Sequence, residues 1–209
     1  MICSYALAME CFQECVQLDP TSYDTVAEKL AECCLQEMRI SDALTHWKYL
    51  TKSHPSVLAS ERLAECHLLI GDLSTSYSLL QECEDAARTN PCEDEFRTQI
   101  KATKEAVSKC EQELTRARQW LAVNQPEKAV RPLLVCRECS PYWRTPFLLL
   151  LRCYVKDNQT EEAYSLLQEV CPWFCHMESQ HNLSSIRLAS SLYHESKNTE
   201  AFDSTFVSL

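Results

Sequence analysis

Cysteine and histidine are the residues of this chain whose spacing could support chemistry. Two short runs stand out, Cys136-Arg-Glu-Cys139 and Cys171-Pro-Trp-Phe-Cys175-His176, and together they offer five ligands for a soft metal ion such as Zn²⁺. Cys171 follows Cys139 by 32 positions, however, which is longer than the spacing in common zinc modules. The interval therefore predicts no metal site, and we expect no cofactor.

Catalysis by these thiols is also disfavoured. Cys136 and Cys139 close a predicted helix, where the helix dipole opposes a thiolate, whereas reactive Cys-x-x-Cys pairs stand at a helix start. The sequence has no Gly-x-Ser-x-Gly or Cys-Gly-x-Cys-Trp motif for nucleophilic hydrolysis, and its six histidines are scattered over helix faces and ends. We therefore expect a protein that is not an enzyme, with no catalytic residues.

The composition excludes further classes of function. The 209 residues carry a net charge of −10, which disfavours a nucleic-acid surface because phosphate binding needs clustered Lys and Arg. With a single glycine, Gly71, the chain has no glycine-rich phosphate loop. No apolar run is long enough to span a bilayer, so we expect no membrane insertion. The first segment lacks a basic leading region, which indicates no signal peptide and a cytoplasmic chain with reduced cysteines.

Helices are the elements that must position any site. Apolar residues recur with helical rather than strand periodicity, and Asn, Asp or Pro stands at the breaks. The pattern predicts about eleven helices, at 3–18, 22–37, 41–53, 56–70, 73–88, 93–123, 126–138, 143–156, 160–172, 178–194 and 198–208. The fold class is therefore all-α, with one long helix near the middle.

A small residue followed by a bulky apolar residue four places on recurs along the chain. The third member, where present, is small or apolar, and the instances are Ala8/Phe12/Cys15, Ala43/Trp47/Leu50, Ser76/Leu80/Cys83, Ala129/Leu133/Cys136, Ala163/Leu167/Val170 and Ala201/Phe205. Their small residues are 35, 33, 53, 34 and 38 positions apart. Periods near 34 are typical of stacked helix pairs, because antiparallel helices approach closely only at a small side chain. Cys15, Cys83 and Cys136 are expected to fill such small-residue positions.

The longest of these intervals, the 53 residues between Ser76 and Ala129, divides the array. It predicts an N-terminal half-array at 1–92 with an incomplete first hairpin, a long linking helix at 93–123, and a C-terminal half-array at 124–209 with a short last helix. The sequence thus predicts an α-solenoid of antiparallel helix hairpins.

These features resemble the tetratricopeptide repeat (TPR). The third hairpin carries the resemblance best, through Leu63, Ala64, Gly71, Asp72, Ser76, Leu80 and Cys83, followed by Asn90-Pro91. The order of hairpins, long charged helix and further hairpin is also similar to the TPR region of the DnaJ-type protein kinase inhibitor co-chaperone family of the endoplasmic reticulum. The His-Pro-Asp tripeptide of a J domain does not occur in this sequence.

The co-chaperone resemblance implies an array that holds unfolded or extended polypeptide clients within an Hsp70 system. It also implies the endoplasmic reticulum lumen as compartment, and a disulfide between Cys139 and Cys153. With the first helix of the first hairpin missing, an apolar strip at Ala8, Phe12 and Val16 is expected to lie open to clients.

The TPR resemblance further implies which side chains line a concave groove. Its register places five residues along the N-terminal groove and two along the C-terminal one: Glu28, Glu32, Gln36, Glu61 and Glu65, then Arg152 and Lys156. An acidic groove favours a basic partner segment. The alternative hypothesis is therefore an assembly scaffold that recognises a specific basic or helical protein partner, and an ordinary solvated face is a third interpretation of the same charges.

Overall fold

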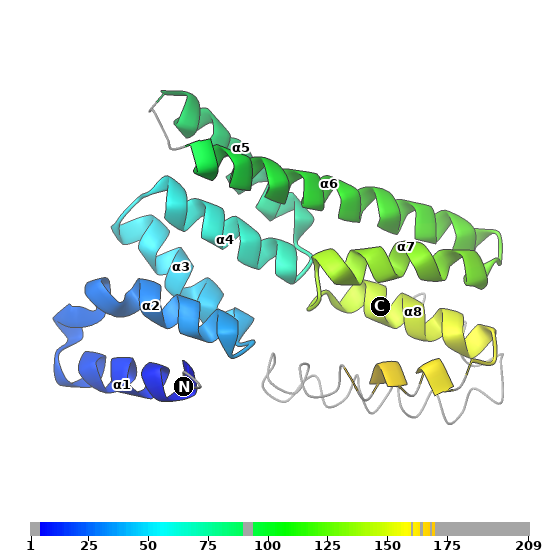
Figure 1. Ribbon diagram of the computed structural model, residues 1–209, viewed down its shortest axis with the longest axis horizontal. Coiled ribbons are helices and arrows are strands. Elements are labelled where there is room, and N and C mark those ends of the chain that lie inside the picture. The colour runs from blue at the N-terminus through cyan, green and yellow to red at the C-terminus, as the bar shows by residue number, and fades with distance from the viewer. Residues whose placement is uncertain (1–4, 90–93, 160, 164, 168, 170–209) are drawn as a thin grey trace.

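The chain folds into helices alone over the part that a computed structural model describes, residues 5–89, 94–159, 161–163, 165–167 and 169 (Figure 1). Eight α-helices and one 3-10 turn follow one another: α1 (Tyr5–Leu18), η1 (Pro20–Ser22), α2 (Tyr23–Gln36), α3 (Ile40–Ser53), α4 (Val57–Leu69), α5 (Leu73–Thr89), α6 (Asp94–Ala122), α7 (Pro126–Cys139) and α8 (Arg144–Lys156). Within these ranges there is no strand, and the all-α prediction is confirmed.

The predicted boundaries agree closely with the eight α-helices. Each helix begins and ends within two residues of its predicted range, and the long helix predicted at 93–123 is α6. The ranges predicted at 178–194 and 198–208 lie outside the described residues, as does much of 160–172.

Four helices end with the same turn. The chain takes a positive φ just beyond α2, α4, α6 and α8, at Met38 (59°), Gly71 (81°), Asn124 (54°) and Asn158 (57°). After α4, for example, the amides of Gly71 and Asp72 donate to the carbonyls of Leu68 and His67, each at 2.9 Å. This double hydrogen bond satisfies carbonyls that the helix end would otherwise leave unpaired. Successive turn residues are 33, 53 and 34 positions apart, the same intervals that separate the small residues of the sequence pattern.

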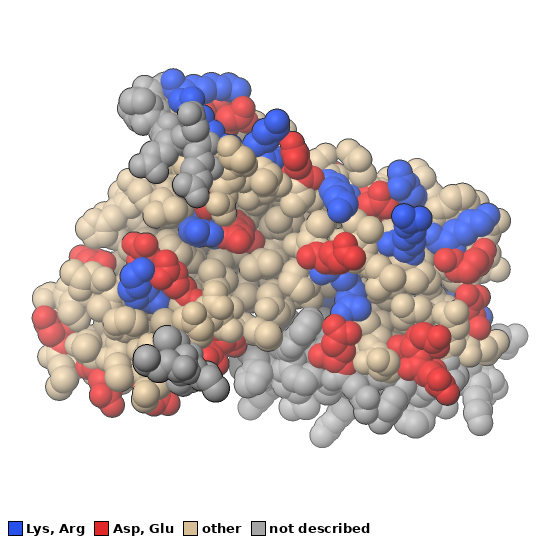
Figure 2. All heavy atoms as spheres, in the orientation of Figure 1, with Lys and Arg blue, Asp and Glu red and all other residues tan. Residues whose placement is uncertain are grey.

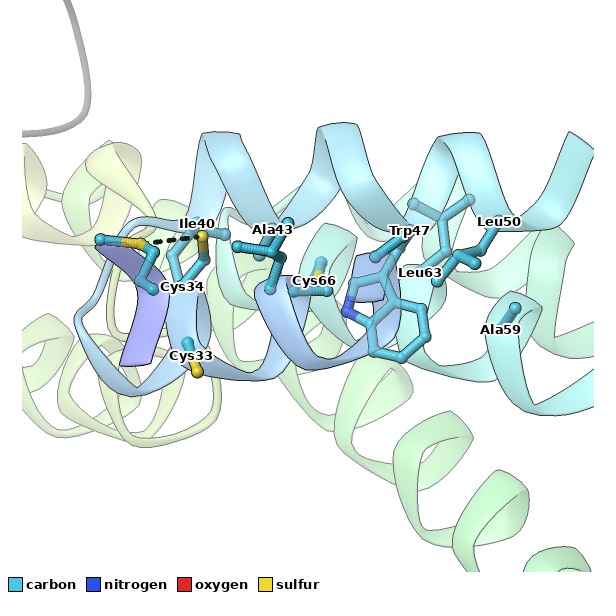
Figure 3. Packing of buried hydrophobic residues seen from close by; sticks show 13 residues of the cluster. Cys33, Cys34, Ile40, Ala43, Trp47, Leu50, Ala59, Leu63 and Cys66 are labelled. Atoms are coloured by element: carbon cyan, nitrogen blue, oxygen red, sulfur yellow. Dashed lines mark hydrogen bonds between the residues drawn. The ribbon is translucent and has the colours of Figure 1, made fainter. Parts of the chain in front are cut away.

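Each α-helix packs against the next one along the chain, so the hairpins stack in sequence order (Figure 1). Three hydrophobic clusters result. The first joins α1 to α4 around Trp47 (Figure 3), the second joins α4 to α6 around Leu80, and the third joins α6 to α8 around Leu133. Helix α6 contributes Val107 to the second cluster and Leu114 to the third. Helix α4 is likewise shared by the first and second clusters, so each of these two helices belongs to two cores.

The small residues of the pattern lie where helices meet. Ala43, Ser76 and Ala129 are fully buried, and Ser76 also donates from Oγ to the carbonyl of Ala64 at 2.7 Å. Cys15 is an exception, because it is exposed. Helix α1 is the first described helix and packs mainly on α2 and η1, which leaves the Cys15 side of α1 in solvent.

The two predicted half-arrays touch each other directly. The loop between α7 and α8 rests on the end of α4, where the amide of Tyr142 donates to the carbonyl of Leu69 at 3.1 Å. The indole of Trp143 covers Gly71 so closely that a Cβ placed on this glycine would lie 2.0 Å from the ring. Gly71 is thus required twice, by its positive φ and by the contact with Trp143.

Candidate functional site

An open groove lies between α5 and the N-terminal half of α6. It encloses about 840 Å³ and is lined by Tyr77, Glu84, Ala87, Arg88, Arg97, Ile100, Lys101, Lys104, Glu105 and Ser108. We call these residues the α5–α6 groove. Its volume falls in the range of ligand-binding clefts, which makes it the candidate site of this protein.

The α5–α6 groove is positively charged although the chain as a whole is strongly negative. Among the described residues, its lining has four cations and two carboxylates, a balance of +2 on a chain with a net charge of −10. Figure 2 shows Lys and Arg side chains along the edge formed by α5 and α6, interspersed with Asp and Glu, whereas Asp and Glu predominate around α1 and α2. Such a local field attracts an anionic partner.

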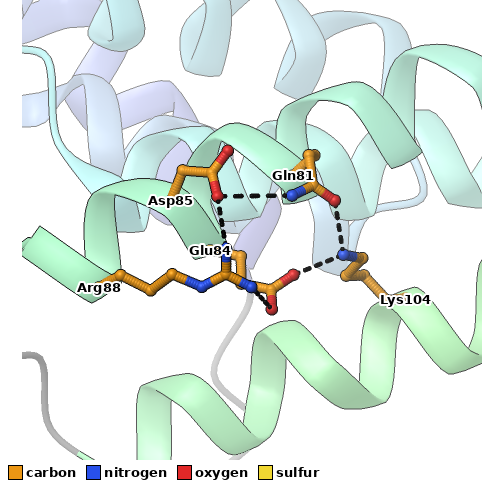
Figure 4. A network of polar contacts seen from close by, with 5 residues as sticks. All are labelled: Gln81, Glu84, Asp85, Arg88 and Lys104. Atoms are coloured by element: carbon orange, nitrogen blue, oxygen red, sulfur yellow. Dashed lines mark hydrogen bonds and ion pairs between the residues drawn. The ribbon is translucent and has the colours of Figure 1, made fainter.

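A polar network bridges the two walls (Figure 4). From α6, Lys104 Nζ lies 2.6 Å from Glu84 Oε2 and donates to Gln81 Oε1 at 3.0 Å. Arg88 pairs with the same Glu84 at 2.9 Å and with Asp85 at 3.1 Å. The hydrogen bond from Lys104 is the main reason why the pKa of Glu84 is below its usual value. Two carboxylates thus serve the two cations, so the network holds Lys104 and Arg88 at the rim in a charge-balanced cluster, and Lys101 and Arg97 supply the excess positive charge.

The floor of the α5–α6 groove is apolar and partly aromatic. Ala87 and Ile100 are buried, whereas the Tyr77 side chain is 48% exposed and lies under the Lys104 ammonium, 5.1 Å from ring centroid to Nζ. A further hydrogen bond between the walls is donated by Arg97 Nη2 to the carbonyl of Ala87, at 3.2 Å. An apolar floor beneath a cationic rim suits a ligand that presents apolar side chains flanked by carboxylates.

The sequence contained a signal for one wall of this groove. Arg97, Lys101 and Lys104 follow the i, i+4, i+7 spacing that places residues on one helix face. Tyr77 and Glu84 come from the preceding helix, and only the packing of α5 on α6 brings them opposite these cations. Because the helix at 93–123 was predicted only as a link between two half-arrays, neither wall of this groove was predicted as a site.

The acidic groove expected on α2 and α4 is only partly present. Glu28 is half-buried and Glu32 exposed, and Glu32 pairs with Lys29 at 2.9 Å. Glu65 accepts from Arg62 Nη1 at 2.8 Å, and the charges of Glu32, Glu61 and Glu65 all act on this arginine. Arg62, which the prediction did not include, thus partly neutralises this surface.

Glu61 is not a groove contact, and its prediction is wrong. Its side chain is 1% exposed, and neither carboxylate oxygen has a hydrogen-bond donor within reach among the described residues. Burial, followed by repulsion from Glu65, raises the pKa of Glu61 to about 7. Helix α4 packs against α3, α5 and α6, so little of its surface remains for an open groove.

The other predicted contacts lie away from Glu61. Gln36 is exposed in the last turn of α2, Arg152 is half-buried in α8, and Lys156 is exposed in the last turn of α8. Arg152 and Lys156 thus lie on α8, which packs against α7, whereas the predicted carboxylates lie on α2 and α4.

The apolar strip on α1 is not open, contrary to prediction. Ala8, Phe12 and Val16 are half-buried and pack against the first hydrophobic cluster, which includes residues of α2. The exposed apolar residues of α1 are instead Tyr5, Leu7 and Leu18.

The predicted disulfide is also absent, because Cys139 and Cys153 are both free thiols. Cys139 ends α7, next to the loop, whereas Cys153 lies nine residues into α8. That position is about 13 Å along the helix from its start, beyond the roughly 7 Å between Cα atoms that a disulfide tolerates.

Among the described residues, no group of three or more His, Cys, Asp or Glu side chains is arranged to hold a metal ion. Cys171, Cys175 and His176 lie outside that part of the chain. None of the described helices is both long and apolar enough to cross a membrane.

Neither the protein-family models nor the curated proteins contain a match to this chain. Its function must therefore be argued from the α5–α6 groove and the arrangement of the helices.

Proposed function

We propose that this protein is a non-enzymatic, TPR-like scaffold that binds a helical segment of a partner protein in the α5–α6 groove. The repeat assignment is supported by the four identical helix-ending turns, because their intervals of 33, 53 and 34 residues match those of the small residues. We further propose that the complete array has about eleven helices, with the remaining ones in the C-terminal part of the chain.

The observation that carries the function is the cationic rim over an apolar floor in the α5–α6 groove. An amphipathic helix can set its apolar side chains against Tyr77 and Ile100. Carboxylates on its flanks can then reach Lys101 and Lys104 at the rim. The partner segment is accordingly acidic, not basic as the α2–α4 carboxylates suggested.

The client-holding function and the basic-partner scaffold have less support. The first depended on an open strip at Ala8, Phe12 and Val16, whose side chains are half-buried against the first hydrophobic cluster. The second depended on Glu61 and Glu65, of which the former is buried and the latter paired with Arg62. The membership of a co-chaperone family stays a hypothesis that rests on the order of elements alone.

The test is binding of a fluorescein-labelled synthetic helix with leucines on one face and glutamates on both flanks, followed by fluorescence anisotropy. Lys101→Glu is the informative variant. The Lys101 side chain is 78% exposed and its ion pair with Glu105 is long, at 3.9 Å, so the change should leave the fold intact. We expect about fivefold weaker binding at low salt, corresponding to about 1 kcal/mol, and a smaller difference at high salt.

Lys128→Glu is the matched control. It makes the same charge change on α7, where Lys128 stacks over Trp120 at 4.9 Å, away from the α5–α6 groove. Equal losses in both variants, or equally tight binding of a lysine-flanked version of the helix, would refute the groove assignment.

A further inference from the structure

One face of α1 is apolar and exposed to solvent. Leu7, Cys11, Cys15 and Leu18 follow one another at intervals of four, four and three residues, so they form one stripe along the helix. All four residues are exposed, Leu7 to 60% and Leu18 to 88%. We call these four residues the α1 stripe. A row of apolar side chains that remains in solvent marks an interaction surface.

In α5 and α7, the position of Cys15 is covered by the helix that precedes each of them. Cys15 is the third member of the repeated small and bulky pattern, and its counterparts Cys83 and Cys136 are both buried. Cys83 Sγ donates to the carbonyl of Val57 in α4 at 3.7 Å. Cys136 Sγ donates to the carbonyl of Cys110 in α6 at 3.5 Å. The third position of the pattern therefore lies against the preceding helix of the hairpin.

The position of Cys11 shows the same relation. Its counterpart in α3 is His46, whose Nδ1 lies 2.6 Å from the Tyr23 hydroxyl oxygen of α2. The counterparts in α5 and α7 are Leu79, which is half-buried, and Pro132, which is buried. Helix α1 is the first of the described helices and lies at one end of their row (Figure 1). The α1 stripe is therefore the counterpart of the surfaces on which α2, α4 and α6 pack, and a helix antiparallel to α1 fits it.

The α1 stripe has an acidic edge. Glu10 and Glu14 are exposed, and each stands one residue before a cysteine of the stripe, so both carboxylates lie along the same side of it. The sequence of α1 contains no Lys or Arg that would balance them. A helix with Lys or Arg along one edge complements this charge. A second copy of this chain does not, because two antiparallel α1 helices related by a two-fold axis set these glutamates against each other.

We propose that the α1 stripe binds an amphipathic helix of a partner protein, with leucine-like side chains on one face and Lys or Arg along one edge. The partner helix runs antiparallel to α1, and its apolar face covers Cys11, Cys15 and Leu18. Its cations reach Glu10 and Glu14. It extends the stack of helices by one member. This inference does not rest on the proposed function, since none of the residues of the α5–α6 groove belongs to α1.

The test uses a fluorescein-labelled synthetic helix with leucines on one face, lysines along one edge and glutamines elsewhere. Its binding to the full-length chain is followed by fluorescence anisotropy. Cys15→Lys is the informative variant, because it places a charge in the middle of the α1 stripe at an exposed position. We expect binding to weaken about tenfold, since this lysine loses water on binding and repels the basic edge of the helix.

Gln13→Lys is the matched control. Gln13 is exposed on the same helix, but it stands two residues from Cys11 and two from Cys15 and therefore lies on another face. It should bind the helix within about twofold of the wild-type protein. Lys101→Glu should also leave this binding unchanged, which separates the α1 stripe from the α5–α6 groove. The lysine-flanked helix of the groove test is measured on Cys15→Lys, so that the α1 stripe does not contribute to that comparison.

Alkylation locates the bound helix independently. Cys11 and Cys15 should react with N-ethylmaleimide in the free protein, and saturating helix should protect both thiols. Tandem mass spectrometry of the tryptic peptide that ends at Lys29 resolves the two positions. Equal weakening by Cys15→Lys and Gln13→Lys would overturn the proposal. So would protection of both thiols in the free protein, or a dimer of this chain that Cys15→Lys abolishes, because the occupant would then be the chain itself.

Discussion

The buried carboxylate of Glu61 should make the stability of this protein depend on pH in an unusual direction. Its folded-state pKa is raised from 4.5 to about 7 by burial and by Glu65, with Arg62 Nε at 3.8 Å opposing the shift. The folded chain therefore holds a proton that the unfolded chain releases above its ordinary pKa of 4.5. This contribution is fully present below pH 4.5 and is lost as the pH rises through about 7.

The size of the effect follows from the two pKa values. A pKa difference of one corresponds to about 1.4 kcal/mol, so Glu61 should contribute about 3 kcal/mol more to the free energy of unfolding at pH 4.5 than at pH 8. That amount is a large fraction of the 5–15 kcal/mol by which domains are typically stable. Glu61→Gln replaces the carboxyl by an amide of the same shape that does not titrate, and it should remove this pH dependence.

Urea unfolding of the wild-type protein and of Glu61→Gln from pH 5 to pH 8.5 is the assay. The variant should gain about 2.5 kcal/mol relative to the wild type across this range, which begins slightly above the unfolded-state pKa. The lowered pKa values of His46 and His67 affect both proteins equally, so their titration cancels in the difference. Glu32→Gln, at an exposed carboxylate, is the control and should follow the wild-type profile. A difference between Glu61→Gln and wild type that stays constant to within about 0.5 kcal/mol would refute the reasoning.

Two further substitutions test contacts elsewhere. Gly71→Ala should lower the free energy of unfolding by about 2–4 kcal/mol in urea, because its Cβ would lie 2.0 Å from the Trp143 ring at a φ of +81°. A double variant with Trp143→Ala should lose less stability than the sum of the two single changes. Strict additivity of the two losses would argue against the contact. Tyr49→Phe should raise the pKa of Asp24 toward its ordinary value, because the Tyr49 hydroxyl donates to Asp24 Oδ1. Titration of the Asp24 carboxyl by NMR checks this, and an unchanged pKa would contradict it.

The helices were predictable because their signals are local. Apolar periodicity gave the length of each helix, and residues suited to a positive φ, such as Gly71, Asn124 and Asn158, mark where three of them end. Met38 occupies the fourth such position although its side chain disfavours that conformation, so that turn carries no comparable sequence signal.

The candidate site was predictable only in part, because it depends on which helix faces are covered. Glu61 was assigned to an open groove because the register of the tetratricopeptide repeat places it there. Helix α4, however, has buried residues around most of its circumference, including Glu61, Ala64 and His67. A helix pattern gives the spacing of side chains, but the number of neighbours around the helix is set by tertiary packing.

Helix α6 has a consequence for how the molecule comes apart. Repeat arrays generally approximate a sum of local units, each stabilised by its nearest neighbours, and such arrays can lose one end while the other persists. Here Ile100 and Val107 anchor one hydrophobic cluster and Leu114 and Ala117 anchor the next, on one uninterrupted helix. Melting either cluster frees part of the backbone that the other needs to remain ordered. The shared helix thus couples these two clusters into a single cooperative transition, and the amides at its centre are the ones whose hydrogen exchange should require opening of both.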